Sequence, residues 1–342
     1  MIPPPIQLFL EMTSACNLRC AHCYLRAGED ARTLPAPLVH ELLAEFHDLG
    51  GQYVSISGGE PTLHYAWRSA VRLARSLGFP CLLISNGTSL SRDAIDFIID
   101  TGTALTMSVD GASPRTHDTI RGAGAFDKTM TSLRYAAARG YGGQMTLAFT
   151  PMAVNVMDLP GVVALANHHG IGTVYISLLE HRGRAADRAA ALQMSDSEKR
   201  ALLFTIFSLQ ERYPDIAIEC VNLKGITERL RGIPLETESL DRTMRITPAA
   251  EIYLTAYLDA EEFHLGAYAP GALAAAWQNE KVRRALDGAS QCAPQCRTCA
   301  LWEACRGGSS ALAWIRNGSH GGVDGYCEAK RAVFGGLAGS DS

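Results

Sequence analysis

Short apolar runs alternate with stretches of helical periodicity along the first half of the chain. Apolar runs of this length, bounded by turn residues, are typical of β-strands, whereas apolar residues repeating every three or four positions indicate helices. Six strands are predicted, at residues 6–12, 53–57, 81–85, 105–109, 145–150 and 174–178. Helices are predicted between them, at residues 36–49, 67–77, 91–101, 126–139 and 159–169. Glycines follow or interrupt several of these helices, as expected at helix C-termini.

Strands that alternate with helices form a parallel sheet with helical crossovers. The pattern therefore predicts an α/β fold, an open, partial (β/α)6 TIM-like barrel over residues 1–184. A bridging region is expected at 185–243, a small cysteine-rich α+β domain at 244–335 and a flexible tail at 336–342.

Shorter elements are predicted after the barrel. Ser195 and Glu198 form a capping-box pattern that opens a helix ending at Pro214. A strand is expected at 216–220, a hairpin at 244–246 and 251–255, and a single helix at 272–286.

Three cysteines lie within eight residues just after the first predicted strand: Cys16, Cys20 and Cys23, spaced C-x3-C-x2-C. Soft thiolate ligands select iron–sulfur clusters, zinc or copper(I). Full ligation of a cubane cluster takes four cysteines, but the next one, Cys81, is nearly 60 residues further on. Three protein ligands leave one coordination position open, which is the arrangement of a catalytic metal centre.

This spacing resembles that of the radical S-adenosylmethionine (SAM) superfamily. The resemblance implies a [4Fe-4S] cluster whose unligated iron binds SAM, and reductive cleavage of SAM to a 5′-deoxyadenosyl radical that abstracts a substrate hydrogen. It also implies the partial barrel. The alternative is zinc, because C-x2-C is a common zinc half-site. His22 is the nearby fourth ligand for zinc, but it occupies a position where the family usually has an aromatic residue.

A Gly-Gly-Glu-Pro turn follows the second predicted strand, at Gly58, Gly59, Glu60 and Pro61. Chemistry in barrels of this type gathers at the C-terminal ends of the strands, and adjacent glycines let the backbone approach a ligand closely. The turn matches the family motif that lies along the methionine part of SAM. Alone it would be a simple loop closure.

Polar residues also follow the third and fourth strands. The resemblance implies that Ser85, Asn86 and Ser108 contact SAM and that Arg121 lies near the SAM carboxylate, whereas ordinary turns and a surface arginine are the alternatives. The role of Asp110 stays open, and no catalytic residue is identified. The SAM-binding residues expected from the resemblance are Tyr24, Gly58, Gly59, Glu60, Pro61, Ser85, Asn86, Ser108 and Arg121.

A second group of five cysteines lies between residues 292 and 327. It resembles the auxiliary-cluster region of the SPASM and Twitch branch of the family, which implies one fully ligated auxiliary [4Fe-4S] cluster. Ser309 stands where the complete SPASM pattern has a further cysteine, so a second auxiliary cluster is not expected. A zinc ribbon is the alternative. Cys292 is interpreted as a bystander, with a replacement ligand and a reactive thiol as its alternatives. The expected ligands are Cys296, Cys299, Cys305 and Cys327.

Composition narrows the remaining classes. A formal charge of −4 argues against nucleic acid as a partner. Apolar runs are too short to span a membrane, and the N-terminus lacks the features of a secretory signal. Ten cysteines in a non-secreted chain point to metal rather than disulfides, and so to the cytoplasm.

The function expected from the resemblance is radical modification of a ribosomally made precursor peptide, by crosslinking, epimerisation or decarboxylation. A flavodoxin-type or ferredoxin-type electron donor is expected as a partner. No leader-binding domain is visible before Pro3, so a separate leader-peptide-binding protein is a further expected partner. The alternative substrate is a small molecule, as in tetrapyrrole side-chain cleavage or alcohol dehydrogenation. An iron–sulfur electron carrier and a methyltransferase are the other classes considered; neither would need both the cysteine loop and the Gly-Gly-Glu-Pro turn.

Overall fold

The computed structural model describes residues 2–180, 182–220, 223, 226, 242–256, 258–289, 293–305, 308, 310–319 and 322–335. Its ten strands form one sheet in the order β10-β9-β8-β1-β2-β3-β4-β5-β6-β7. The strands are β1 (Gln7–Glu11), β2 (Tyr53–Ser57), β3 (Cys81–Ser85), β4 (Ala104–Ser108), β5 (Met145–Phe149), β6 (Thr173–Ile176), β7 (Ala217–Cys220), β8 (Thr243–Ile246), β9 (Glu251–Leu254) and β10 (His264–Ala267).

Strands β1 to β6 pair in parallel in sequence order, which confirms the predicted partial barrel. The parallel part of the sheet extends beyond the six predicted strands at both ends. At one end β7, which lies in the predicted bridging region, pairs in parallel with β6. At the other end β8 pairs in parallel with β1. One sheet thus crosses the proposed boundaries between the barrel, the bridging region and the C-terminal domain. The division of the chain into these domains stays a prediction.

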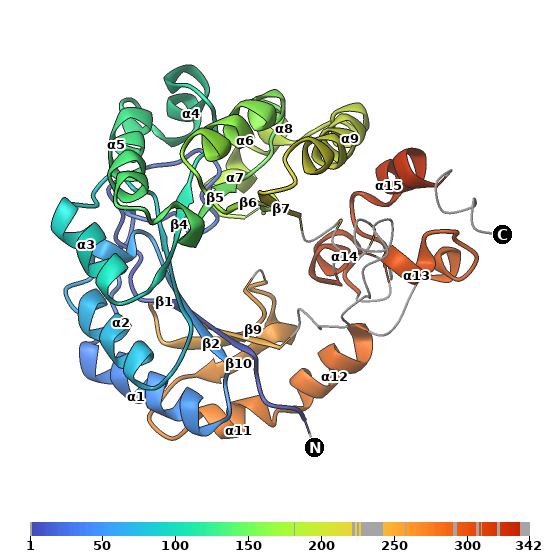
Figure 1. The fold of residues 1–342 in the computed structure, drawn as a ribbon. Coiled ribbons are helices and arrows are strands. Elements are labelled where there is room, and N and C mark those ends of the chain that lie inside the picture. The colour runs from blue at the N-terminus through green and yellow to red at the C-terminus, as the bar shows by residue number, and fades with distance from the viewer. Residues whose placement is uncertain are drawn as a thin grey trace.

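Helices cover the outer side of the curved sheet (Figure 1). Helix α1 shows why: Val39, Leu42, Leu43 and Phe46 are fully buried and lie on one face, at the spacing of an amphipathic helix. The outer helices are α1 (Ala36–Asp48), α2 (Trp67–Ser76), α3 (Arg92–Asp100), α4 (Pro114–Arg121), α5 (Ala125–Ala138), α6 (Leu159–His168) and α9 (Asp196–Arg212).

Shorter helical segments complete the first part of the chain. They are α7 (Arg184–Asp187), α8 (Ala189–Leu192) and the 3₁₀ turns η1 (Pro61–Leu63), η2 (Gly142–Gln144) and η3 (Val156–Asp158). The predicted capping box is confirmed at the start of α9, where Ser195 and Glu198 satisfy each other's backbone N–H groups.

The predicted hairpin is confirmed, because β8 and β9 are antiparallel. The single helix predicted at 272–286 was wrong. Two helices occupy this stretch, and the Asn279 side chain accepts a hydrogen bond from the Lys281 backbone N–H at 2.9 Å. An asparagine that bonds the backbone two residues on competes with helix continuation and starts a new helix. The helices are α11 (Leu273–Trp277) and α12 (Glu280–Ala289).

Helix α15 (Cys327–Phe334) lies beside α9 (Figure 1). Phe334 of α15 packs on Phe207 of α9, with ring centroids 6.1 Å apart. In the described part of the chain, no helix is long and apolar enough to cross a membrane. The remaining elements are η4 (Glu261–Phe263), η5 (Pro294–Cys296), α13 (Trp302–Cys305), α14 (Ser310–Asn317) and α15 (Cys327–Phe334).

Candidate active site

The first cysteine loop lies directly after β1, at the C-terminal edge of the parallel sheet. Cys20 is buried, whereas Cys16 and Cys23 are half-buried. The nine described cysteines are all free thiols; Cys292 lies outside the described residues. Cys81 and Cys220 are buried and lie apart from both cysteine sets along the chain.

Each thiol of the loop faces a hydrogen-bond donor. The backbone N–H groups of Leu18 and Ala27 donate to the sulfurs of Cys16 and Cys23, at 3.5 and 3.4 Å. The guanidinium of Arg121 lies 4.0 Å from the sulfur of Cys20. Donors and cations around sulfur stabilise the thiolate form that binds metal.

Burial counteracts those donors while the loop carries no metal. It raises the pKa of Cys20 to about 11, although Arg121 lowers it, and it also raises the pKa of Cys16. Metal binding here must therefore release protons. No three Cys, His, Asp or Glu side chains in the described ranges converge on one ion. In a cubane cluster each cysteine would bind a different iron, so the three thiols need not converge on one ion.

The Gly-Gly-Glu-Pro turn is pressed against the cysteine loop. Gly58 has φ +134°, and a Cβ on it would meet the Thr13 carbonyl oxygen at 2.3 Å. A Cβ on Gly59 would meet the carbonyl oxygen of Ala15 at 2.3 Å. The close approach predicted for these glycines thus includes the backbone of the cysteine loop. Pro61 is buried and opens η1.

Glu60 connects the ends of β2 and β3. Its fully buried carboxylate accepts hydrogen bonds from the Ser85 hydroxyl at 2.9 Å, the Asn86 backbone N–H at 2.8 Å and the Thr62 hydroxyl at 2.6 Å. Burial nevertheless raises the pKa of Glu60 above its ordinary value. This bonding means that Glu60 and Ser85 hold each other in place.

Asn86 reaches the cysteine loop. Its side-chain amide donates to the Asn17 side-chain oxygen at 2.9 Å and lies 3.9 Å from the sulfur of Cys16. Ser108 is the last residue of β4 and is half-buried. Its hydroxyl makes no hydrogen bond to the described residues, so it is available to a ligand.

Asp110 and Arg121 form a buried ion pair beside Cys20. The Arg121 Nε donates to Asp110 Oδ2 at 2.6 Å, and the Thr150 backbone N–H donates to Asp110 Oδ1 at 2.8 Å. Burial alone would raise the pKa of Asp110, but Arg121 and its other partners lower it below the ordinary value. His22 Nε2 lies 3.4 Å from Asp110 Oδ2, and burial lowers the pKa of His22 to about 4. One role of Asp110, which the sequence left open, is therefore to hold the Arg121 guanidinium in position.

The segment after β6 closes over the cysteine loop. Gly183 has φ +58°, and a Cβ there would meet the carbonyl oxygens of Tyr24 and Cys23 at 2.4 and 2.5 Å. The Arg184 backbone N–H donates to the Cys23 carbonyl at 2.9 Å, and its Nε donates to the Cys20 carbonyl at 3.0 Å. Residues 182–185, with the sequence Arg-Gly-Arg-Ala, therefore hold the backbone of the cysteine loop in place.

A polar cluster that sequence reasoning missed lies on the other side of Tyr24. The Tyr24 hydroxyl donates to Glu11 Oε1 at 3.0 Å, and Arg245 Nη1 lies 3.6 Å from the same oxygen. Arg245 and Arg182 both bind Asp259. Charged residues inside apolar strand runs, at positions 11 and 245, were the available signal.

Several buried atoms of this cluster make no hydrogen bond within the described residues. They are one acceptor and several donors: Glu11 Oε2, Arg182 Nη2, Arg245 Nε and Arg245 Nη1. Buried polar atoms are usually paired with protein or with ordered water, so these atoms have hydrogen-bonding capacity left for water or for a ligand.

The second set of cysteines lines one cavity. All four predicted ligands contribute to its wall, together with Lys330 and Arg331. Lys330 Nζ lies 3.9 Å from the sulfur of Cys305. The cysteines are Cys296, Cys299, Cys305 and Cys327.

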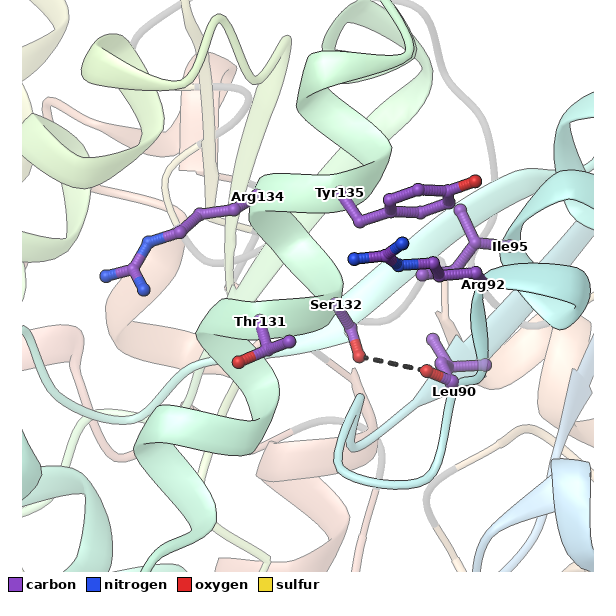
Figure 2. Close-up of a pocket in the computed structure, with 7 residues that line it drawn as sticks. All are labelled: Leu90, Arg92, Ile95, Thr131, Ser132, Arg134 and Tyr135. Carbon is purple, nitrogen blue, oxygen red and sulfur yellow. Dashed lines mark hydrogen bonds between the residues drawn. The ribbon is translucent and has the colours of Figure 1, made fainter.

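A larger pocket of about 340 Å³ lies on the outer side of the barrel, between α3 and α5. Figure 2 shows the Arg92 guanidinium against the Tyr135 ring, while Arg134 points away from it. The wall carries no cysteine, histidine or carboxylate, so the pocket is separate from the chemistry of the cysteine loop.

Comparison with known proteins agrees with this geometry. Residues 10–158 match the model of the Radical SAM superfamily. The mycofactocin maturase MftC of Mycobacterium tuberculosis is 27% identical over 328 residues, which cover 94% of this chain and 83% of that protein. The AdoMet-dependent heme synthase of Oleidesulfovibrio alaskensis is 28% identical over 198 residues, which cover 56% of this chain and 50% of that protein.

Solved structures share the fold along nearly the whole chain. The structure of anSMEcpe with bound AdoMet superposes with a TM-score of 0.79 at 14% identity and covers 96% of both chains. Streptococcus suis SuiB bound to the precursor peptide SuiA gives 0.75 at 17% identity and covers 95% of this chain and 76% of that one. The matched segment 10–158 contains both the C-x3-C-x2-C loop and the Gly-Gly-Glu-Pro turn, and with the relation to MftC it places this chain among the enzymes of the radical SAM superfamily.

Proposed function

We propose that this radical SAM enzyme modifies a ribosomally made peptide. The observation that carries the proposal is the relation to the mycofactocin maturase MftC along 94% of the chain. The relation to a heme synthase covers only 56% of it, so small-molecule chemistry is the second candidate. When bound, the reduced [4Fe-4S] cluster of the superfamily supplies the electron that cleaves SAM to methionine and a 5′-deoxyadenosyl radical.

Cys16, Cys20 and Cys23 are the proposed ligands of that cluster. Their support is the ring of donors around the loop, from the backbone N–H groups and from Arg121. Asp110 holds Arg121 beside Cys20 through the 2.6 Å ion pair. Through this pair, the Arg121 guanidinium is held next to the position where the cluster would bind.

The SAM site is proposed at the polar strand ends beside the loop. Gly58 and Gly59 leave the backbone free of side chains at the place where it meets the loop. The Ser108 hydroxyl makes no hydrogen bond within the described residues, whereas Glu60 acts through Ser85 and Asn86 by fixing their positions. Two further residues complete the proposed set. Tyr24 directly follows Cys23 in the sequence, and Arg121 contacts the sulfur of Cys20.

The polar cluster around Glu11 and Arg245 is proposed to contact the substrate. It combines a carboxylate oxygen and guanidinium N–H groups that make no hydrogen bond within the described residues. A peptide amide has one N–H donor and one C=O acceptor, and so complements both. The cluster contains three carboxylates, Glu11, Glu180 and Asp259, against two guanidinium groups. That balance suits a neutral amide better than an additional carboxylate.

The second cysteine set is proposed to hold one auxiliary [4Fe-4S] cluster, supported by the single cavity that the four thiols line. A structural zinc would use the same four ligands, so metal analysis decides between them. The further partners proposed are an external electron donor of the flavodoxin or ferredoxin type and a separate leader-peptide-binding protein. The proposed compartment is the cytoplasm.

Metal content and SAM cleavage test the cluster assignments. After anaerobic reconstitution, we expect about eight irons in the wild type and about four in a Cys16/Cys20/Cys23→Ala variant. With SAM and dithionite, only the wild type should release 5′-deoxyadenosine. A fully loaded wild type that does not release 5′-deoxyadenosine would contradict the radical assignment. About four irons together with zinc would mean that the second cysteine set holds zinc instead of an auxiliary iron–sulfur cluster.

Isotope transfer tests the substrate class. Peptides encoded beside the gene would be made with perdeuterated residues and incubated with enzyme, SAM and reductant, next to a matched set with a tetrapyrrole. We expect deuterium in 5′-deoxyadenosine and a mass change in the peptide. Transfer from the tetrapyrrole alone would favour the small-molecule alternative.

A further inference from the structure

A buried lysine lies beside the second cysteine set. The Lys330 side chain is 1% exposed, and its Nζ lies 3.9 Å from the sulfur of Cys305. Lysine is almost never fully buried unless it is paired. Lys330 belongs to α15, and the first residue of that helix is the proposed ligand Cys327. The same short helix therefore positions both the lysine and the ligand.

The partner of Lys330 is Asp324, which is itself fully buried. Lys330 Nζ donates to Asp324 Oδ2 at 2.6 Å, and the Tyr326 backbone N–H donates to Asp324 Oδ1 at 2.9 Å. A Cβ at Gly308, where φ is +85°, would meet Asp324 Oδ2 at 1.9 Å and Lys330 Nζ at 2.8 Å. The backbone at Gly308 therefore lies directly against the ion pair and leaves no room for a side chain at this position.

Both charges act on the proposed ligands. Lys330 Nζ lies 3.9 Å from the sulfur of Cys305, and the Cys327 backbone N–H donates to the Asp324 carbonyl oxygen at 3.3 Å. The pair is thus close enough to Cys305 and Cys327 to change the electrostatic potential at whatever those thiolates hold. The reduction potential of an iron–sulfur cluster depends on nearby charge and on hydrogen bonds to its sulfurs.

We propose that the Lys330–Asp324 pair sets the reduction potential of the auxiliary cluster. Adding one electron makes a cluster more negative by one charge, which the Lys330 ammonium favours and the Asp324 carboxylate disfavours. Lys330 therefore raises the potential and Asp324 lowers it. The inference rests on the proposed auxiliary cluster.

The test measures the potential of that cluster alone. The full-length chain with Cys16, Cys20 and Cys23 changed to Ala would be reconstituted anaerobically, and its midpoint potential followed by electron paramagnetic resonance during a redox titration. Lys330→Met keeps the aliphatic stem and should lower the midpoint. Asp324→Asn should raise it, and Lys330→Arg should keep it near that of the parent. Lys128→Met, on the exposed face of α5, is the matched control and should leave it unchanged.

Opposite shifts separate an electrostatic role from a structural one, because loosening of the site would move both variants in the same direction. If Lys330→Met fails to retain iron, Asp324→Asn and Lys330→Arg still decide the question. Unchanged midpoints, or shifts of the same sign, in variants with about four irons would overturn the inference. Zinc in the wild-type site would overturn it too, while 5′-deoxyadenosine release by the intact enzyme would leave the radical assignment standing.

Discussion

Charged residues near both cysteine sets are buried as pairs. Arg121 contacts Cys20 and is held by Asp110, and Lys330 contacts Cys305 and is held by Asp324. Sequence reasoning singled out Arg121 but kept a surface arginine as its alternative, because a single sequence does not show burial. The structure decides this, since the side chain is only 9% exposed. A buried cation needs a partner, and the partner at position 110 belongs to the same strand end that sequence reasoning had marked as polar.

We expect Asp110→Asn to destabilise the metal-free protein by about 3–5 kcal/mol, because it leaves the Arg121 charge buried without a counter-charge. Urea unfolding would measure this loss. Asp96→Asn is the matched control: it breaks a more exposed pair, with Arg139, and should change the unfolding free energy little. Equal losses in the two variants would contradict the burial argument.

Elements with regular apolar spacing were predictable from the sequence alone. Strands β2 and β3 match the predicted bounds, and the helices that carry an apolar stripe match within one or two residues at each end. Helix α4 was missed, because its buried face consists of His117, Ile120 and Arg121, two of which read as polar. The polar cluster around Arg245 was missed because its contact between Glu11 and Arg245 joins strands that are more than 200 residues apart in the sequence.

The buried face of α4 predicts a pH dependence. His117 is fully buried, and its Nδ1 accepts a hydrogen bond from the Asp110 backbone N–H at 3.2 Å. Burial lowers the pKa of His117 from 6.5 to about 4. Between pH 6.5 and pH 4, His117 therefore binds a proton in the unfolded chain but stays neutral in the folded chain. The stability from the neutral imidazole is present above pH 6.5 and is lost as the pH falls towards 4.

At pH 5 this loss amounts to about 2 kcal/mol for His117, from about 1.4 kcal/mol per unit of pKa. Urea unfolding of the metal-free chain at pH 7.5 and pH 5 should show it. His117→Gln should reduce the difference between the two pH values, whereas His47→Gln, on the exposed end of α1, should not. A wild-type stability that stays constant or rises on acidification would contradict the prediction.

At the scale of the whole molecule, contacts connect the two sides of the predicted domain boundary at residue 243. Strand β8 pairs with β1, and the Trp277 indole N–H donates to the Pro3 carbonyl at 2.7 Å. Glu45 of α1 accepts hydrogen bonds from the Tyr268 hydroxyl and from the backbone N–H that begins α11, at Leu273. Periodicity identified the strands on both sides of this boundary. Their pairing could not be predicted, because the partners are non-local and the apolar pattern of β1 fits a strand with one neighbour as well as with two.

We expect the fragment 1–242 to lose the cooperative unfolding of the full chain. Without β8, the backbone groups of β1 become an unpaired sheet edge that invites association, and the fully buried Glu11 loses the neighbouring Arg245 charge. Size-exclusion chromatography and urea unfolding would compare the fragment with the full chain and with the truncation 1–335, which keeps the whole sheet. A monomeric fragment that unfolds at the urea concentration of the full chain would mean that the barrel is an independent domain. Association and a broad transition, with 1–335 unaffected, would mean that the closing strands from the C-terminal part belong to the folding unit that positions the cysteine loop.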